Sequence, residues 1–384
     1  MSSTAPAATP PTSPPDVVHL TSVHPPDDAR IAARECRTLL DAGIATVLVA
    51  ADIGRAPYRE LPTLLVRRPS GRLMRILLGT WRTLMAGASL RAPIYHLHDP
   101  ELIPAGLVLK VLGKRVVYDV HENLPKQVLG KRWIPRWARP IAARLATLVE
   151  RVADSFFDAI VVANATSLAR FRNPRTVLVR NYADVREFAR SVTTTPYEDR
   201  QPVIAYVGAI SRERGLLEMV DAMAMVQHED ASLVLAGPMP EDLLDVVAAR
   251  RGWHRVVAAG WHSRDAVQDL LARSQIGIAV LHPLPNYLDN YPSKLFEYMA
   301  SGIPSIVSDF PLWREVIEDA DCGVVVDPLN PRGIATAIDG LLADPERAKA
   351  AGERGRAATH ETLNWAAEGE KLVQLYSQLM RRSA

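Results

Sequence analysis

Short apolar runs rich in β-branched residues recur along this chain of 384 residues, and segments of helical character separate them. The first run covers residues 17–21, a helix is expected over residues 29–40, and the next run covers residues 47–50. A strand, a helix and another strand in this order are typical of a parallel α/β sheet. The ligands of such sheets bind at the carboxyl ends of the strands. We therefore expect the functional residues to follow the apolar runs.

Length and composition fit a soluble protein of two domains. Apolar residues make up 48% of the chain and charged residues 23%, and the net charge of +2 is too small to indicate a nucleic-acid partner. No run approaches the length of a membrane-spanning helix, and the first residues lack the apolar segment of a secretory signal. The two cysteines, Cys36 and Cys322, fall in different predicted domains without metal-ligand spacing, which favours a reducing, cytoplasmic location.

The expected domain boundaries follow from composition. Residues 1–15 are rich in Pro, Ser and Thr and are expected to be a disordered tail. A first domain is expected over residues 16–190 and a second over residues 202–360. The polar, turn-rich residues 191–201 are the expected linker between them. Residues 361–384 are left as a last helical segment.

The most informative stretch is residues 286–309. A polar loop leads into a short helix over residues 294–301, Gly302 is placed to end that helix, and an apolar strand follows Pro304. A loop that enters a helix N-terminus offers free backbone N–H groups to an anion such as phosphate. Lys294 stands at that end, where a cation disfavours the helix unless an anion is bound. The alternative is a surface loop before an ordinary amphipathic helix.

Residues 294–304, KLFEYMASGIP, resemble the nucleotide-sugar-binding segment of glycosyltransferase family 4, whose members are retaining enzymes of the GT-B fold. The resemblance implies an α/β protein with two Rossmann-like domains whose parallel sheets face each other across a cleft. It also implies that the last helix, within residues 361–384, packs back on the first domain.

The same resemblance assigns roles to several residues of this stretch. Glu297 matches the glutamate whose carboxylate binds the ribose hydroxyls of the donor. Asp289 has the spacing of a second acidic residue near the donor sugar, where the family more often has Glu. The Gly-Phe-Gly that often follows that acid is replaced by residues 290–292. Ser293 and Leu295, which flank Lys294, are expected to bind the donor as well.

A second anion site is expected at the start of the second domain. A strand over residues 203–208 runs into Gly208, and Arg212 and Arg214 precede the next helix. In the family, Arg follows this glycine and Lys precedes the glycine that starts the helix. Here Ala209 replaces the first cation, Arg214 stands at the Lys position, and Arg212 is a candidate to compensate. Without the resemblance, these arginines would be assigned to a solvated turn.

Trp261 lies just after a predicted strand over residues 256–261, where family members recognise the nucleobase through backbone groups. The resemblance therefore implies that Trp261 lines the base pocket. Backbone recognition leaves little trace in side chains, so the sequence does not identify the base.

In the first domain, polar residues follow two consecutive predicted strands. His98 and Asp99 end one strand, and His121 and Glu122 end the next. Family members carry a histidine after the corresponding strand that approaches the donor sugar, and His121 matches it. The alternative is a histidine with a purely structural role. The polar loop at residues 24–30 is expected to face the same site, or else to form a rigid turn.

Two segments of the first domain, residues 61–98 and 123–149, contain many basic residues and no Asp or Glu. The first segment is interpreted as a basic amphipathic helix, and the second interleaves tryptophans with its charges. Such segments suit an anionic membrane surface or an anionic acceptor. The alternative is a solvated basic face over an apolar one.

Together these features predict a glycosyltransferase that moves a sugar from a nucleoside-diphosphate sugar to an acceptor hydroxyl with retention, in bacterial glycan, glycolipid or glycosylated-metabolite biosynthesis. The acceptor would be a small molecule or lipid-linked, and peripheral contact with the inner membrane face is an option. No metal or cofactor is expected, because cationic groups would stabilise the departing diphosphate. The alternatives are a nucleotide-sugar epimerase of the GT-B fold and a non-catalytic scaffold. The predicted catalytic residues are His121, Asp289, Arg214 and Lys294.

Overall fold

The computed structural model divides the chain into two compact units. Unit 1 consists of Met1–Asn181 and Ala366–Ala384, and unit 2 of Tyr182–Trp365. The residues that the structure describes are 13–58, 61–71, 74–131, 134–189 and 195–381.

Unit 1 is built on a seven-stranded sheet in which all neighbouring strands are parallel. The order β3-β2-β1-β4-β5-β6-β7 places the start of the chain at the centre of the sheet, and the direction of winding reverses between β1 and β4. Ligands of doubly wound sheets bind at such a reversal. The strands are β1 (Val17–Leu20), β2 (Thr46–Asp52), β3 (Thr63–Arg67), β4 (Ile94–Leu97), β5 (Arg115–Val120), β6 (Ala159–Val162) and β7 (Thr176–Leu178).

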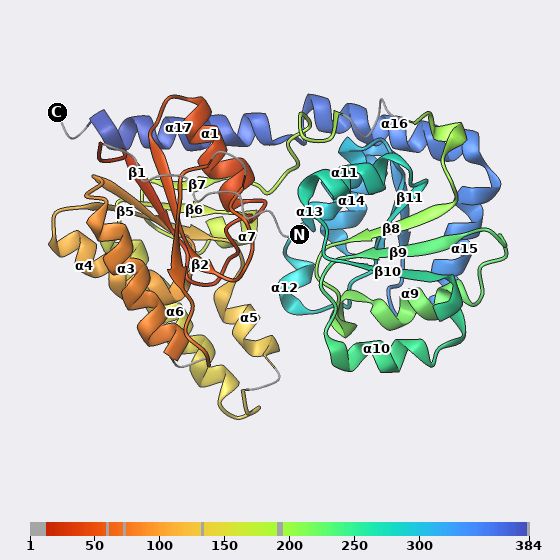
Figure 1. Ribbon diagram of the computed structural model, residues 1–384, viewed down its shortest axis with the longest axis horizontal. Coiled ribbons are helices and arrows are strands. Elements are labelled where there is room, and N and C mark those ends of the chain that lie inside the picture. Colours follow the sequence, from red (N-terminus) through yellow and green to blue (C-terminus); the bar gives the residue numbers. More distant parts are fainter. Residues whose placement is uncertain (1–12, 59–60, 72–73, 132–133, 190–194, 382–384) are drawn as a thin grey trace. The chain divides into compact units, whose positions relative to one another are not determined.

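Helices cover both faces of this sheet. Figure 1 shows α1 and α17 along one face and α3, α4 and α6 along the other. No helix among the described residues is long and apolar enough to cross a membrane. The helical segments are η1 (Ile31–Cys36), α1 (Arg37–Asp41), η2 (Arg75–Gly79), α3 (Thr80–Ser89), η3 (Pro100–Leu102), α4 (Ile103–Val111), α5 (Leu124–Gly130), α6 (Arg139–Phe156), α7 (Ala165–Leu168) and α17 (Trp365–Arg381).

The two faces of the unit 1 sheet differ in polarity because side chains alternate along each strand. Val18 and Leu20 on β1 pack with Leu97 on β4 in the hydrophobic core beneath α3 and α4. His19 lies between those two apolar residues and therefore points to the opposite face. Its register partner on β4 is His96, so the two imidazoles are neighbours, with ring centroids 4.6 Å apart. The face beneath α17 is thus polar at its centre.

Two predictions about secondary structure in unit 1 were right only in part. The basic segment within residues 61–98 was interpreted as an amphipathic helix, but β3 occupies Thr63–Arg67 before the helices η2 and α3 begin. The positive charges obscured a short apolar run that pairs in parallel with β2. The expected helix over residues 29–40 instead starts as a π-helix, Ile31–Cys36, before the α-helical turn Arg37–Asp41.

Unit 2 is built on a six-stranded parallel sheet in the order β10-β9-β8-β11-β12-β13, which also reverses beside its first strand. Its hydrophobic core lies between this sheet and helices that include α9, α13 and α15. The strands are β8 (Val203–Val207), β9 (Ser232–Ala236), β10 (Val256–Gly260), β11 (Ile276–Ala279), β12 (Ser305–Ser308) and β13 (Gly323–Val326).

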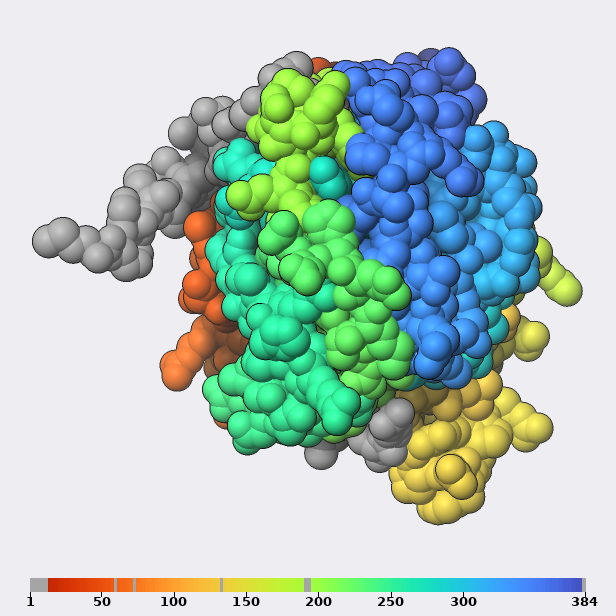
Figure 2. All heavy atoms as spheres, turned by 90° about the vertical axis from the view of Figure 1, so that its right-hand side faces the viewer, coloured from red at the N-terminus to blue at the C-terminus, as the bar shows by residue number. Residues whose placement is uncertain are grey.

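The later helices of unit 2 pack against its first segment. Figure 2 shows α15 and α16 in blue beside the green residues that open the unit, and Lys349 Nζ lies 2.6 Å from Glu198 Oε1 there. The helical segments are η4 (Tyr197–Asp199), η5 (Arg212–Arg214), α9 (Leu216–Met223), α10 (Glu241–Ala248), η6 (Arg251–Arg255), α11 (Arg264–Ala272), α12 (Pro285–Leu288), α13 (Ser293–Ala300), α14 (Pro311–Ala320), α15 (Pro331–Ala343) and α16 (Pro345–Glu361).

A buried tyrosine fixes α13 against the centre of the unit 2 sheet. Tyr298 Oη donates a hydrogen bond to Ile278 O on β11 (3.0 Å) and accepts one from Val207 N on β8 (3.3 Å). Gly277 gives the ring its space, because a Cβ atom there would lie 2.3 Å from the Tyr298 ring. The N-terminus of α13 is therefore held beside the carboxyl end of β8.

Some expected boundaries involve residues outside those described. Of the expected tail, residues 1–12 lie outside them, and so does the start of the expected linker, residues 190–194. The two units divide at Asn181 and again at Trp365. All of α17 after Trp365 belongs to unit 1, where Tyr376 Oη lies 2.7 Å from His96 Nδ1.

Candidate functional site

The carboxyl end of β8 and the start of α13 meet at Gly208 and Lys294. Gly208 has a φ of +109°, a conformation that favours glycine, and a Cβ atom there would lie 3.6 Å from Lys294 Nζ. Lys294 is buried, and its ammonium lies 4.3 Å from the centre of the Tyr206 ring and 3.3 Å from Tyr206 Oη. The predicted anion-binding glycine and lysine are thus neighbours in space.

Arg214 lies close to the same lysine. It ends the short helix η5, and Gly215 follows with a φ of +73° and so little room that a Cβ atom would lie 1.9 Å from Val280 O. Hydrogen bonds join the Arg214 side chain to the hydroxyl groups of Tyr206 and Tyr287. Arg212, at the start of η5, is half-buried. Ala209, which replaces the cation of the family motif, is exposed and accepts a hydrogen bond from Tyr206 Oη through its carbonyl.

The electrostatics around Lys294 and Arg214 favour the binding of an anion. Among the residues that the structure describes, no ion pair joins Lys294 or Arg214 to a carboxylate. Burial, together with the nearby Arg214 charge, lowers the pKa of Lys294 well below its ordinary value. Burial acts to lower the pKa of Arg214 as well, but Tyr206 and Tyr287 outweigh it and raise that pKa. A buried lysine beside a half-buried arginine would gain from an anionic ligand.

Glu297 is held in place by a chain of two charged neighbours. Arg264 Nη1 donates to Glu297 Oε1 (3.0 Å), and the other edge of the guanidinium donates to both oxygens of Glu187 (2.7 Å each). Burial acts to lower the pKa of Arg264, but Glu297 and Glu187 raise it. A bidentate carboxylate on a buried arginine is a rigid arrangement, and it orients the Glu297 carboxylate.

The remaining predicted donor residues have varied surroundings. Asp289 follows α12 and is half-buried, as is Ser293 in the first turn of α13. The Leu295 side chain belongs to the hydrophobic core of unit 2, and its backbone N–H donates to Pro292 O (3.0 Å). Trp261 follows β10 with 49% of its surface exposed.

In unit 1, the strand ends bring His121 together with His98. His121 Nε2 lies 3.1 Å from His98 Nδ1 and 3.2 Å from Asp119 Oδ2. Asp119 also receives two hydrogen bonds from the buried Arg30 (3.1 and 3.0 Å). Burial acts to raise the pKa of Asp119, but Arg30 and the histidines lower it well below its usual range. His121, with 18% of its side chain exposed, is thus backed by an ionised carboxylate.

The polar loop before η1 borders these strand ends. His24 stacks on His121 with ring centroids 4.9 Å apart, and its Nδ1 lies 3.3 Å from Asp28 Oδ2. Burial acts to lower the pKa of His24, but Asp28 and the nearby aspartates raise it to about 9. Asp27 lies 3.6 Å from Arg55 Nη1. Asp28 also accepts from the backbone N–H groups of Arg30 and Ile31, so it fixes the turn that enters η1.

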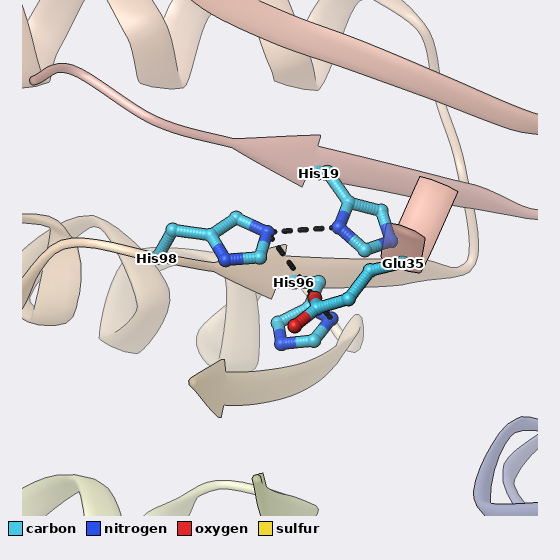
Figure 3. A group of neighbouring side chains, drawn as sticks. All are labelled: His19, Glu35, His96 and His98. Atoms are coloured by element: carbon cyan, nitrogen blue, oxygen red, sulfur yellow. Dashed lines mark hydrogen bonds and ion pairs between the residues drawn. The ribbon is translucent and has the colours of Figure 1, made fainter. Parts of the chain in front are cut away.

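Behind these residues lies a buried cluster of His19, Glu35, His96 and His98 (Figure 3). The linear sequence shows no metal-ligand spacing here, yet one potential ligand atom from each residue lies within 4.8 Å of the others. His98, Asp119 and His121 form a second such group, which shares His98.

Sequence reasoning missed Arg264, Glu187 and Tyr206 at the unit 2 site. Arg264 could have been predicted from the sequence, because it follows Trp261 closely and is the first residue of a helix that Ser263 caps. Glu187 has no signal of its own, since its partner is 77 residues away in the sequence. Tyr206 was taken as one more apolar residue of a strand. In unit 1, Glu35 was missed because its position in a π-helix is invisible to helical periodicity.

The model of the family described as glycosyl transferases group 1 matches residues 190–358, which is most of unit 2. Among curated proteins, the chain is 24% identical over 286 residues to the alpha-D-kanosaminyltransferase of Streptomyces kanamyceticus, covering 71% of this chain and 73% of that protein. It is 28% identical over 209 residues to the N-acetyl-alpha-D-glucosaminyl L-malate synthase of Bacillus anthracis, which covers 52% of each chain.

Solved structures resemble the whole chain. Sucrose-phosphate synthase from Thermosynechococcus elongatus superposes with a TM-score of 0.72 at 19% identity, covering 95% of this chain and 99% of that one. Anabaena Alr3699/HepE, solved in complex with UDP and glucose, has a TM-score of 0.71 at 12% identity and covers 95% and 100%. At these identities the likeness establishes the fold of the two units.

Proposed function

Because this chain is a glycosyltransferase of the GT-B fold whose unit 2 matches the family of glycosyl transferases group 1, we propose that unit 2 binds a nucleoside-diphosphate sugar. The observation that carries the proposal is the pair of Lys294, which is buried, and Arg214, which is half-buried, at the end of β8. A diphosphate would supply the negatively charged partner that no ion pair gives these two side chains among the described residues.

Backbone groups add to the attraction for phosphate. α13 directs its N-terminal N–H groups to the same corner as Lys294, and Gly208 leaves the backbone open to close approach. The resemblance between Alr3699/HepE, which was solved with UDP-glucose, and this chain supports a nucleotide sugar as the ligand class. Glu297, oriented by Arg264, is suited to accept hydrogen bonds from the ribose hydroxyls.

The proposed reaction retains the anomeric configuration of the sugar. The bond between the anomeric carbon and the diphosphate oxygen breaks, and the acceptor oxygen forms the new bond on the same face. The leaving diphosphate takes the acceptor proton, and Arg214 and Lys294 stabilise the charge that develops on it. Asp289 is assigned to the donor sugar. No additional general base is needed in this scheme.

The direct test is thermal stabilisation of the purified protein by UDP, GDP, dTDP and ADP, with NAD as the unrelated nucleotide. A ligand at a hundred times its dissociation constant stabilises by about 2.7 kcal/mol, which is visible as a higher melting temperature. We expect one diphosphate to act, and Glu297→Ala and Arg214→Ala to reduce the shift. Lys349→Ala, on an exposed lysine, is the matched control. A folded sample that responds to no diphosphate would refute the donor site.

We further propose that unit 1 meets its acceptor at an anionic membrane surface. The observation is a stripe of exposed apolar side chains at helical spacing on α6, Ile141, Leu145 and Leu148, each between 53% and 58% exposed. A second stripe on η2 and α3 consists of Leu77, Trp81 and Met85. Arg144 lies exposed next to the first stripe. Exposed apolar stripes with flanking arginines suit the interface of an anionic bilayer.

Sedimentation with lipid vesicles tests this surface. We expect the protein to pellet with vesicles that contain phosphatidylglycerol and to stay in solution with pure phosphatidylcholine. The double variant Leu145→Gln, Leu148→Gln should release it, whereas Leu244→Gln, which removes an exposed leucine of unit 2, should not. Equal pelleting of all three proteins would show that the α6 stripe is not the contact, and no pelleting at all would favour an acceptor in solution.

A further inference from the structure

We propose that unit 1 contains a buried binding site for a divalent transition-metal ion, best suited to Zn²⁺, formed by His19, Glu35, His96 and His98 (Figure 3). The site is independent of the donor site in unit 2 and of the sugar-transfer proposal.

The first argument is the convergence of the four side chains. His19 Nδ1 lies 2.8 Å from His98 Nε2, Glu35 Oε2 lies 4.0 Å from His98 Nε2, and each of the four residues offers one ligand atom within 4.8 Å of the others. Four ligands held 2.0–2.2 Å from a tetrahedral Zn²⁺ are about 3.3 Å apart. The observed spacings lie on both sides of that value, so shifts of a few tenths of an ångström would complete the coordination shell.

The second argument is the supply of unused electron pairs. His19 Nε2, His96 Nε2 and Glu35 Oε2 have no hydrogen-bond partner among the described residues. All four residues of the cluster are fully buried, or nearly so, and an unsatisfied polar atom in that position is costly. Glu35 Oε1 lies 2.9 Å from Arg30 Nε, and Oε2 is the oxygen that lies nearer the histidines. A cation beside Oε2 would give this buried oxygen a partner.

The third argument is the chemistry of the donor set, which consists of imidazole nitrogens and one carboxylate. Three imidazoles and one carboxylate suit Zn²⁺ and its transition-metal neighbours better than Ca²⁺ or Mg²⁺, which prefer oxygen ligands.

The fourth argument is the outer support that metal-binding histidines usually have. His98 Nδ1 lies 3.4 Å from Asp119 Oδ2, while Nε2 of the same ring faces His19 and Glu35. Arg30 in turn holds Asp119, and Tyr376 on α17 lies 2.7 Å from His96 Nδ1. Glu35 also projects from the π-helix η1, and π-helices are often found at functional sites.

A metal site that is closed to solvent would stabilise the fold and would not take part in a reaction. The ligands come from β1, from η1 and from the β4 end, and Tyr376 extends the network to α17. An ion would tie these elements together at the polar centre of the sheet face. With no water-accessible position among the four residues, the ion would have no exchangeable site for substrate.

The test uses the untagged, full-length protein. After dialysis, elemental analysis should find Zn²⁺ close to one ion per chain, and replacement by Co²⁺ should give intense visible absorption typical of a four-coordinate site. Glu35→Gln, nearly equal in size to the original, and His96→Gln should each lower Zn²⁺ affinity at least tenfold. His254→Gln, on an exposed histidine of unit 2, is the matched control and should leave the metal content unchanged.

Two results would overturn the proposal. One is a folded wild-type protein that contains no transition metal and gains no thermal stability from added Zn²⁺, Co²⁺ or Ni²⁺. The other is Zn²⁺ that remains at wild-type affinity in a folded Glu35→Gln, His96→Gln double variant, which would place the ion elsewhere. If the single variants fail to fold, Tyr376→Phe is used instead, because it leaves all four proposed ligands in place. If this variant has the Zn²⁺ affinity and the Co²⁺ spectrum of the wild type, the result counts against the site.

Discussion

In unit 1, the ends of β4 and β5 hold histidines and aspartates that pair with one another and with Arg30. In unit 2, the end of β8 faces Lys294 and Arg214, which have tyrosines as neighbours but no carboxylate partner among the described residues. Both units place polar groups at the carboxyl ends of parallel strands, as this architecture predicts. The difference lies in which groups are left without a partner. In unit 2, Lys294 and Arg214 have no ion pair with a carboxylate among the described residues, and in unit 1 buried nitrogen and oxygen atoms of the histidine cluster have no hydrogen-bond partner.

This contrast indicates that a parallel sheet determines where a site forms, whereas the side chains at the strand ends determine the charge of its ligand. Lys294 and Glu297 lie one helical turn apart on α13 and have opposite surroundings. Glu297 shares the Arg264 guanidinium with Glu187, whereas no ion pair joins Lys294 to a carboxylate among the described residues. A ligand that carries its charge at one end and hydroxyl groups further along fits this arrangement.

The largest expected effect comes from removing the cations of unit 2. Lys294→Met and Arg214→Met should each lower the turnover number by about 10²–10³, the usual loss when one donor to a developing oxyanion is removed. Steady-state transfer kinetics with the diphosphate sugar identified by thermal stabilisation give the measurement. Lys349→Met is the control, and its turnover should equal that of the wild type. If all three variants have the same turnover number, the positive charges of Lys294 and Arg214 do not contribute to catalysis.

A second prediction concerns the pairing within unit 1. His24 has a pKa of about 9 in the folded protein and about 6.5 when unfolded. A raised pKa contributes stability that is complete below pH 6.5 and is lost as the pH rises through 9. His24→Gln should therefore cost about 2 kcal/mol at pH 6, reduced from the full shift because the side chain is 30% exposed, and much less at pH 9.5.

Urea denaturation at the two pH values measures this difference, with the exposed His254→Gln as the control. A cost that does not change between pH 6 and pH 9.5 would mean that His24 acts by packing on His121 and not by its charge.

The features that could be predicted from the sequence all depend on residues that are close together in the chain. The apolar runs predicted β1 and β2 in unit 1 and β8 and β10 in unit 2, although β3 was missed, and Gly302 with Pro304 indicated the end of α13. Glu297 and Lys294 followed from a short motif. The arginine that orients Glu297 depends on Glu187, and the histidine cluster depends on the register of β1 with β4. Such contacts between distant residues, together with the π-helix around Glu35, leave no mark on local periodicity.

A third, smaller effect should come from the support behind Glu297. Glu187→Gln keeps the size of the side chain but weakens its charge-assisted contact with Arg264, so Glu297 is held less firmly. We expect the dissociation constant for the diphosphate to rise about tenfold, which corresponds to about 1.4 kcal/mol. Glu198→Gln is the matched control, because it breaks an exposed ion pair with Lys349. Calorimetric titration measures the dissociation constant of the diphosphate for each variant. Equal affinities of Glu187→Gln and Glu198→Gln would show that Arg264 orients Glu297 without help from Glu187.

The smallest expected effect tests the charge state of Lys294 directly. Burial and Arg214 lower its pKa, which favours the uncharged amine in the free protein. A bound diphosphate beside the amine favours the ammonium form, raises that pKa and draws a proton from the buffer. Calorimetric titrations at pH 8.5, in buffers with different ionisation enthalpies, should therefore show an uptake of less than one proton per diphosphate bound. Lys294→Met should abolish the uptake, and Lys349→Met should not. Absence of proton uptake in the wild type would show that the lysine is already charged before the ligand arrives.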